Sequence, residues 1–262
     1  RSTIEINATD LGTEDLITPQ DMVVTLSHSG YMKSQPLSEY RAQKRGGRGK
    51  QAAGTKDDDW IEQLFIANTH DYILCFSNRG RMYWLKVWEV PQGSRTSRGK
   101  PIVNMFPLQE GEKVTVVLPL FGEDSEFPED RYVFMATSHG VVKKTSLSDF
   151  SNPRKAGIIA VDLDEGDFLI GASLTNGGND VMLFSDAGKA VRFDESDVRP
   201  MGRTARGVRG MNLEDGQLVI AMLVAQNEQQ SVLTATENGY GKRTDRKSTR
   251  LNSSNTDISR MP

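Results

Sequence analysis

The sequence predicts an all-β protein built as an array of small blades of about four strands each. A motif of Ser or Thr, two variable residues and Gly recurs at residues 27–30, 77–80, 137–140, 185–188 and 236–239. Its glycines follow one another at intervals of 50, 60, 48 and 51 residues. A period of about fifty residues that contains several short strands is typical of propeller blades. About five blades are visible, and the last is incomplete.

Each motif is expected to close a β-hairpin, because apolar runs that look extended lie on both sides of it. Residues 23–26 precede the first turn, and residues 181–184 and 190–193 flank the fourth. Two such runs joined by a turn that ends in glycine are typical of a hairpin. An inserted polar loop at residues 122–130 explains the long interval of 60 residues.

The repeat continues beyond the hairpin with an apolar anchor, a second glycine and a closing strand. The anchors are Tyr40, Val90, Phe150 and Val198, and the second glycines are Gly49, Gly99, Gly157 and Gly207. Acidic turns and apolar runs such as 114–118 and 218–222 then end the copies. Each copy therefore has room for about four strands.

The repeats divide the chain into three parts. Residues 1–20 are expected to form an N-terminal linker with a first strand. Residues 21–244 are expected to form the β domain, with blades starting near residues 21, 71, 131, 180 and 231. We interpret the polar tail at residues 245–262 as not native.

Composition limits the function classes. The net charge of −3 gives no sign of a polyanionic partner, so a cationic surface would require that the charges are sorted onto one side. No apolar stretch approaches the length of a membrane span, and the N-terminus has no signal-peptide pattern. We therefore predict a cytoplasmic protein without a membrane partner.

The residues that carry chemistry do not form a pattern typical of an active site. His28, His70 and His139 are scattered, and we interpret them as turn residues and not as metal ligands. The acidic run 57–59 is interpreted as a solvated turn, with a site for a hard metal as the alternative. Cys75 lies in an apolar run and is expected to be buried. We predict no catalytic residue, no metal and no cofactor in this chain.

Cations recur at equivalent positions of successive repeats, and these are the candidate DNA contacts. Equivalent positions of stacked repeats form a line, and Lys and Arg side chains bind phosphate. Near the turn glycines stand Lys33, Arg79, Arg81, Lys143, Lys144, Arg192, Lys242 and Arg243. Near the second glycines stand Lys44, Arg45, Arg48, Lys50, Arg95, Arg98, Lys100, Arg154, Lys155, Arg203, Arg206 and Arg209. The alternative is that these cations only keep strand edges soluble.

Residues 43–50 concentrate charge and glycine more than any other segment. They read Gln43, Lys44, Arg45, Gly46, Gly47, Arg48, Gly49 and Lys50. Glycines let a backbone approach another surface closely, and the cations suit phosphate. A nucleotide P-loop is excluded, because the first glycine of that motif is replaced by Lys44 and no Ser or Thr follows Lys50.

Residues 43–49 closely resemble the seven-residue signature box of the C-terminal domain of bacterial DNA gyrase A. Lys44 stands where Arg is usual and Arg48 where Lys is usual, and both exchanges keep the charge. The flanks at residues 24–28, 35–40, 67–71 and 238–244 are also similar. The resemblance covers about residues 1–244. Topoisomerase IV has a related bladed domain that lacks this box.

The resemblance implies a β-pinwheel, in which neighbouring blades exchange strands. It also implies that the domain wraps double-stranded DNA around a basic perimeter in a positive sense, so that gyrase, a type IIA topoisomerase, introduces negative supercoils during ATP-dependent strand passage. The box would distinguish wrapping from simple relaxation.

The same resemblance implies a bacterial, nucleoid-associated protein. Its partners would be the N-terminal domain of the same polypeptide and the gyrase B protein, and ATP and Mg would bind elsewhere in the holoenzyme. Two alternatives stay open: a DNA-bending domain of the topoisomerase IV type, and a propeller scaffold that binds protein partners.

Overall fold

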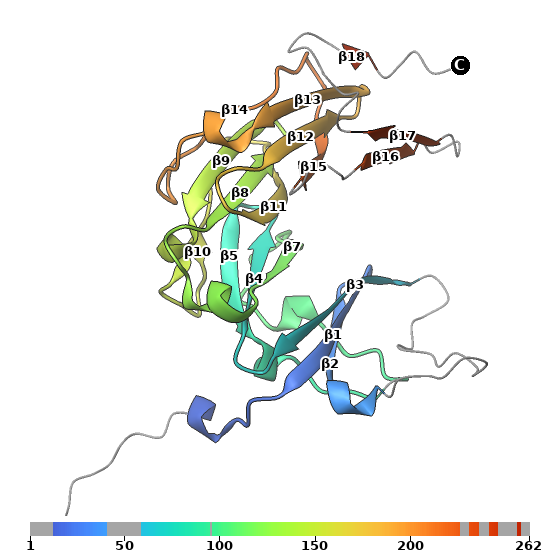
Figure 1. The fold of residues 1–262 in the computed structure, drawn as a ribbon, viewed down its shortest axis with the longest axis vertical. Coiled ribbons are helices and arrows are strands. Elements are labelled where there is room, and N and C mark those ends of the chain that lie inside the picture. Colours follow the sequence, from blue (N-terminus) through green and yellow to red (C-terminus); the bar gives the residue numbers. More distant parts are fainter. Residues whose placement is uncertain are drawn as a thin grey trace, which may run out of the picture. The chain divides into compact units, whose positions relative to one another are not determined.

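The computed structural model describes residues 13–40, 59–94 and 96–225, and the backbone of three further strands at residues 231–235, 241–245 and 256–257. This part of the chain consists of β-strands and short 3-10 turns (Figure 1). The strands form four sheets of four strands and one sheet of two strands. The prediction of an all-β array of four-stranded blades is therefore confirmed.

The first two sheets have the orders β3-β1-β2-β6 and β10-β5-β4-β7. The strands of the first sheet are β1 (Asp21–Ser27), β2 (Tyr31–Pro36), β3 (Ile61–Asn68) and β6 (Lys100–Pro101). Those of the second sheet are β4 (Tyr72–Ser77), β5 (Arg81–Lys86), β7 (Val114–Pro119) and β10 (Ile158–Ile159).

The next two sheets have the orders β11-β8-β9-β14 and β15-β12-β13-β18. The third sheet contains β8 (Tyr132–Thr137), β9 (Val141–Ser146), β11 (Leu169–Thr175) and β14 (Val208–Arg209). The fourth contains β12 (Asp180–Ser185), β13 (Lys189–Asp194), β15 (Val219–Ala225) and β18 (Thr256–Asp257). The last hairpin pairs β16 (Ser231–Ala235) with β17 (Gly241–Asp245).

The first three sheets each take their short edge strand from the next repeat. The strand β6 follows the second hairpin in the chain but pairs with β2 of the first sheet. In the same way β10 pairs with β5, and β14 with β9. This is the exchange of strands between neighbouring blades that the resemblance implied. The edge strand of the fourth sheet is β18, which pairs with β13 and lies in the tail at residues 245–262.

The chemistry of the hairpin turns explains the repeated motif. In the turns at 27–30, 77–80, 137–140 and 185–188, the glycine N–H donates to the carbonyl of the Ser or Thr at 2.9–3.1 Å. These glycines have φ values between +73° and +80°, which a residue with a Cβ adopts only under strain. The Ser or Thr hydroxyl accepts from the N–H after the glycine at 3.1–3.3 Å.

Contacts within the chain divide it into two compact units. The first comprises residues 1–74, 84–107 and 119–125, and the second comprises residues 75–83, 108–118 and 126–262. The first sheet belongs to the first unit, and the third and fourth sheets belong to the second. Among the described residues, no helix is long and apolar enough to cross a membrane.

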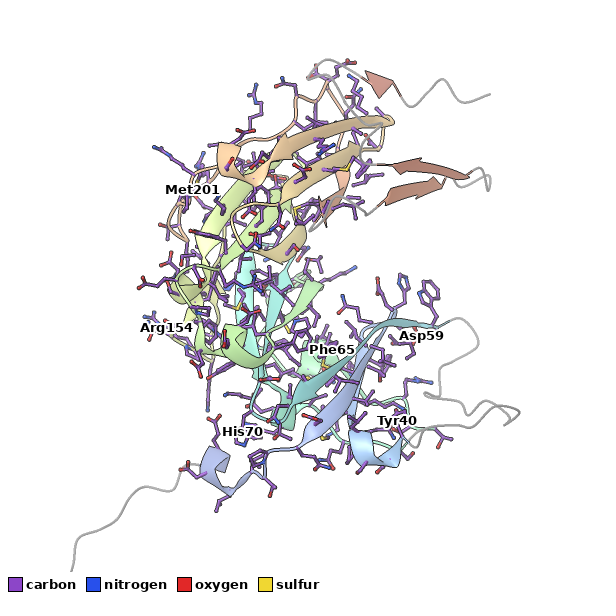
Figure 2. The ribbon with its side chains drawn as sticks, viewed as in Figure 1. Tyr40, Asp59, Phe65, His70, Arg154 and Met201 are labelled. Atoms are coloured by element: carbon purple, nitrogen blue, oxygen red, sulfur yellow. The ribbon has the colours of Figure 1, made fainter. Side chains whose placement is uncertain are left out.

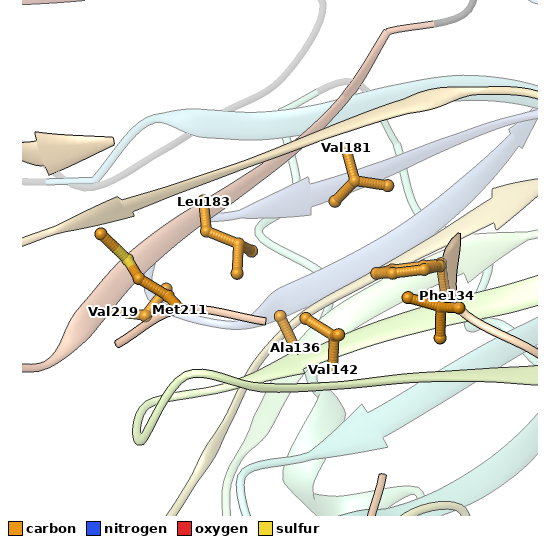
Figure 3. Close-up of a cluster of buried hydrophobic side chains, with 8 residues drawn as sticks. Phe134, Ala136, Val142, Val181, Leu183, Met211 and Val219 are labelled. Atoms are coloured by element: carbon orange, nitrogen blue, oxygen red, sulfur yellow. The ribbon is translucent and has the colours of Figure 1, made fainter. Parts of the chain in front are cut away.

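The core of the second unit lies between the third and fourth sheets (Figure 3). Its buried side chains are Phe134, Ala136, Val142, Val181, Leu183, Val198, Met211 and Val219. The anchors Val90, Phe150 and Val198 are buried, as the repeat predicted, whereas Tyr40 is half-buried. Cys75 is also buried, and loss of hydration raises the pKa of its thiol. The apolar side chains of the repeat thus form the core between successive blades.

Candidate nucleic-acid interface

The segment with the strongest sequence signal lies outside the described residues. The described chain runs to Tyr40 and begins again at Asp59, and both are labelled in Figure 2. The candidates Gln43, Lys44, Arg45, Gly46, Gly47, Arg48, Gly49, Lys50 and Arg95 fall outside it, as do the side chains of Lys242 and Arg243. The prediction that these residues contact DNA stays a prediction.

The loops that lead into the exchanged strands carry several of the other candidates. We call residues 92–99, 151–157 and 200–207 the exchange loops. They end at Gly99, Gly157 and Gly207, whose φ values are +86°, +69° and +105°. A Cβ on Gly99 would clash with the Met32 carbonyl oxygen, and one on Gly207 would lie 2.5 Å from that of Val142. Glycine is therefore needed where the loop passes the strand of the preceding repeat.

Most of the described cations near the second glycines lie at the surface. Arg154 and Lys155 are exposed on the second exchange loop, and Arg154 is labelled in Figure 2 at the margin of the ribbon. Lys100 and Arg209 are exposed on β6 and β14, and Arg203 is half-buried. Arg98 is also half-buried, with its guanidinium carbon 5.0 Å from the centre of the Tyr31 ring. The exchange loops thus present cations at equivalent positions of successive repeats.

One of these surface cations already has carboxylate partners. The Arg206 side chain is 69 % exposed, its Nη1 lies 2.8 Å from Asp164 Oδ1, and its Nε lies 3.4 Å from Asp162 Oδ2. A phosphate would compete with these two carboxylates for the same guanidinium.

Three arginines near the turn glycines hold groups of the protein itself. Arg79 donates to Gln109 Oε1 at 3.0 Å, and Arg81 donates to the Ala156 carbonyl at 2.6 Å. Arg192 forms an ion pair with Asp180, with its Nε 3.1 Å from Oδ2. These side chains are exposed or half-buried. They therefore lie at the surface, but each already binds another group of the protein.

Three lysines of the candidate set do not reach the surface, which corrects the prediction. Lys33, Lys143 and Lys144 are 2 %, 1 % and 4 % exposed. They lie on β2 and β9, the third strands of their sheets, among residues that are buried in turn. A DNA phosphate cannot contact a buried ammonium, so we remove these lysines from the candidate interface.

The buried lysines are satisfied by backbone carbonyls. Lys33 Nζ donates to the carbonyls of Ser94 and Ser97, and Lys143 Nζ donates to those of Ala160 and Arg203. Desolvation lowers the pKa of Lys33 and lowers that of Lys143 to about 8. A signal was present in the sequence, because the equivalent residues Tyr83 and Val191 are not cationic.

The Lys144 ammonium donates to the Glu195 carbonyl at 3.1 Å and lies 5.2 Å from the centre of the Tyr132 ring. Glu195 is itself fully buried, and its carboxylate accepts from Thr175 and Asn179. This network links β9, β11 and the turn after β13.

The histidines take part in turns and short contacts. His28 stacks on Trp60 with 4.0 Å between ring centres, and His139 donates its backbone N–H to Asp167. Within the described ranges, no group of three or more His, Cys, Asp or Glu side chains is arranged to hold a metal ion.

Sequence reasoning missed the attachment of the segment before the first strand. Lys86 Nζ lies 2.7 Å from Glu14 Oε1 and 3.7 Å from the centre of the Tyr72 ring, and it donates to the His70 carbonyl at 2.8 Å. The hydroxyl of Thr69 donates to the Thr18 carbonyl at 3.0 Å. Residues 13–20 are therefore bound to the first unit. No local sequence pattern indicates these contacts.

Comparison with known proteins agrees with this architecture. A family described as the DNA gyrase C-terminal domain, a beta-propeller, matches residues 21–68, 71–120, 131–176, 179–226 and 230–247. The DNA gyrase A protein of Salmonella typhimurium is 55 % identical over 244 residues, and that of Escherichia coli is 54 % identical. Both alignments cover 93 % of this chain but only 27 % of the relative, so the chain spans about a quarter of their length.

Solved structures have the same fold. The C-terminal domain of DNA topoisomerase IV gives a TM-score of 0.75 at 29 % identity and covers 87 % of this chain and 68 % of that chain. The DNA gyrase A C-terminal domain gives 0.61 at 29 % identity, with 86 % and 71 % covered. The structural likeness alone does not separate the two, whereas the sequence relatives are gyrase A proteins. Together with the exchanged strands and the family match, they establish that this chain belongs to the family of DNA gyrase A C-terminal domains.

Proposed function

We propose that this chain binds double-stranded DNA through the exchange loops and wraps it in a positive sense. The observation that carries the proposal is the recurrence of exposed cations just before or after Gly99, Gly157 and Gly207. Contacts to phosphate set affinity and position without reading bases. Many modest contacts are required, because bending 20–30 bp of DNA by 40–90° costs on the order of 1–6 kcal/mol.

In the whole enzyme, the wrapped segment would be passed through a cleaved duplex, so that the positive wrap becomes negative supercoils. The N-terminal domain of the same polypeptide and the gyrase B protein are the proposed partners, and they would supply cleavage and the sites for ATP and Mg. The chain itself would be a non-catalytic module that acts at the bacterial nucleoid.

Salt dependence of duplex binding tests the proposed DNA surface. The logarithm of the binding constant should fall linearly with the logarithm of salt concentration, and Arg154→Ala should make the slope less steep by about 0.9. Lys113 is an exposed cation outside the exchange loops, so Lys113→Ala is the matched control and should leave the slope unchanged. Duplex binding that is absent at low salt would instead favour a scaffold for proteins.

Supercoiling by the reconstituted enzyme tests the box. Replacing Lys44, Arg45 and Arg48 by Ala should abolish supercoiling while relaxation continues, because the box is proposed to clamp the wrap. Unchanged supercoiling would refute this role.

Bending without a full wrap is the second candidate, and the likeness to the topoisomerase IV C-terminal domain favours it. Nicked circles religated with the chain bound separate the two candidates. Wrapping should leave a positive shift in linking number, whereas simple bending should leave none.

A further inference from the structure

Two buried lysines at equivalent positions reach the exchange loop of the next repeat. Lys33 and Lys143 each lie three residues after a turn glycine. The Lys33 ammonium donates to the carbonyls of Ser94 and Ser97 at 3.0 and 2.9 Å. The Lys143 ammonium donates to the Ala160 carbonyl at 2.7 Å and to the Arg203 carbonyl. Each amine thus connects a strand to the loop that passes over it.

We propose that Lys33 and Lys143 are positioning residues that hold the exchange loops in the conformation that presents cations to DNA. This inference rests on the proposed function. The contact in the second unit is direct, because the acceptor is the carbonyl of Arg203, whose side chain is a candidate DNA contact. In the first unit, the acceptors Ser94 and Ser97 lie on either side of Arg95 in the chain.

The energetics indicate a specific role for these amines. Burial of an ammonium is unfavourable unless hydrogen bonds compensate it, and an apolar side chain would fill the same space at lower cost. Val191 shows that the repeat accepts an apolar residue at this position. A lysine brings three donors, so Lys33 binds two carbonyls of its loop, and Lys143 binds one loop carbonyl together with that of Ala160.

In the second repeat, a different residue binds the exchange loop. Its equivalent of the two lysines is Tyr83, whose ring packs against Gly157 and whose hydroxyl donates to Glu112. The loop is held instead by Arg81, which donates to the Ala156 carbonyl at 2.6 Å. In all three described exchange loops, a cation on the second strand of the preceding repeat's hairpin donates to a loop carbonyl.

Fixing a loop in the free protein removes part of the ordering cost of binding. We therefore expect Lys143→Met to weaken duplex binding about tenfold, although it removes no exposed charge. We also expect coupling with the loop: Arg206→Ala should cost less affinity in the Lys143→Met background than in the wild-type chain.

Amide hydrogen exchange of the whole chain without DNA tests the tether on its own. The Ser97 N–H donates to the Ser94 carbonyl and the Ala205 N–H donates to that of Gly202, so these amides report on the first and third loops. Lys143→Met should speed exchange at Ala205 but not at Ser97, and Lys33→Met should do the reverse. Each variant is thus the control for the other.

The inference is overturned if Lys143→Met leaves exchange at Ala205 unchanged, or if exchange rises while duplex affinity and the effect of Arg206→Ala stay the same. If Lys143→Met does not fold, Lys33→Met with Arg98→Ala provides the same comparison in the first unit. Failure of the wild-type chain to bind duplex DNA would refute the proposed function, whereas the exchange data would still decide whether the lysines hold the loops.

Discussion

At the scale of single residues, the glycines of the loops and turns meet two separate requirements. Gly207 has a φ of +105°, and a Cβ there would lie 2.5 Å from the Val142 carbonyl oxygen. Gly216 has a φ of +79°, but no atom lies within 4 Å of its missing Cβ. A comparison of Gly207 with Gly216 therefore separates the requirement for a positive φ from the requirement that no Cβ is present.

Gly216→Ala should therefore lower the free energy of unfolding by about 1–2 kcal/mol, the cost of left-handed backbone with a Cβ. Gly207→Ala should cost more, because the strand of the preceding repeat must also move. Urea unfolding of both variants checks this order. Equal losses would show that the close approach of the loop contributes nothing.

Burial of Lys143 should make the free energy of unfolding depend on pH in the alkaline range. Its pKa is lowered from 10.5 to about 8 in the folded chain, with desolvation as the main cause. Between these values the unfolded chain binds more protons than the folded one, so stability rises with pH. The cost of burying the charge is fully present below pH 8 and disappears above the unfolded pKa.

The free energy of unfolding should thus rise from pH 8 to pH 10.5 by on the order of 3 kcal/mol through this group. Lys143→Met should lack this contribution, and the difference between wild type and variant isolates it from other titrating groups. Parallel pH profiles of the two proteins would contradict a buried ammonium.

At the scale of elements, a small charge cluster binds the segment before β1. Lys86 holds Glu14, and its hydrogen bond is the largest cause that lowers the pKa of that carboxyl. Because the pKa is lowered, the contact is in place above the ordinary carboxyl pKa and is lost as the pH falls through the folded value. This cluster therefore attaches the turn at Thr13–Leu16 to the first unit above that pH.

Lys86→Met should release residues 13–20 without unfolding the sheets. The Ile17 amide donates to the Glu14 carbonyl, so its hydrogen exchange should become faster in the variant. Lys189 is the control, since it forms a similar ion pair with Glu214 at 2.6 Å on another strand. Lys189→Met should leave exchange at Ile17 as in wild type.

Local features of the fold were predictable, and contacts between distant segments were not. The Ser or Thr and the Gly of each hairpin turn satisfy hydrogen bonds within four residues, so their pattern is visible in the sequence. The sequence predicts Lys33 at the surface, because nothing local shows that its acceptors, Ser94 and Ser97, lie about sixty residues away in the chain. Arg154, predicted at the surface from the recurrence of cations before the second glycines, is exposed.

At the scale of the whole molecule, acidic and basic groups compete on a chain with a net charge of −3. Asp164 neutralises Arg206 from the acidic turn of the preceding repeat, at 2.8 Å. Such a pair would have to open, or share its guanidinium, when a phosphate binds. The acidic turns therefore limit how tightly the proposed DNA surface can bind.

Asp164→Asn should strengthen duplex binding more than Glu165→Gln, although both remove one negative charge. Only Asp164→Asn removes a carboxylate partner of Arg206. The difference in duplex affinity between the two variants therefore measures the effect of freeing the Arg206 guanidinium. Affinities measured at low and moderate salt check this expectation. Equal effects would mean that only the overall charge matters.

Each repeat gives an edge strand to the repeat before it, and this affects how such arrays can change in length. The strands β6, β10 and β14 each complete a sheet begun by the repeat before. A duplicated repeat inserted between two others would give an edge strand to the repeat before it and receive one from the repeat after it. Removal of an internal repeat joins a donor to a new acceptor of the same geometry. Gene duplication and deletion can therefore alter the number of blades in whole units, while each intermediate remains a paired array.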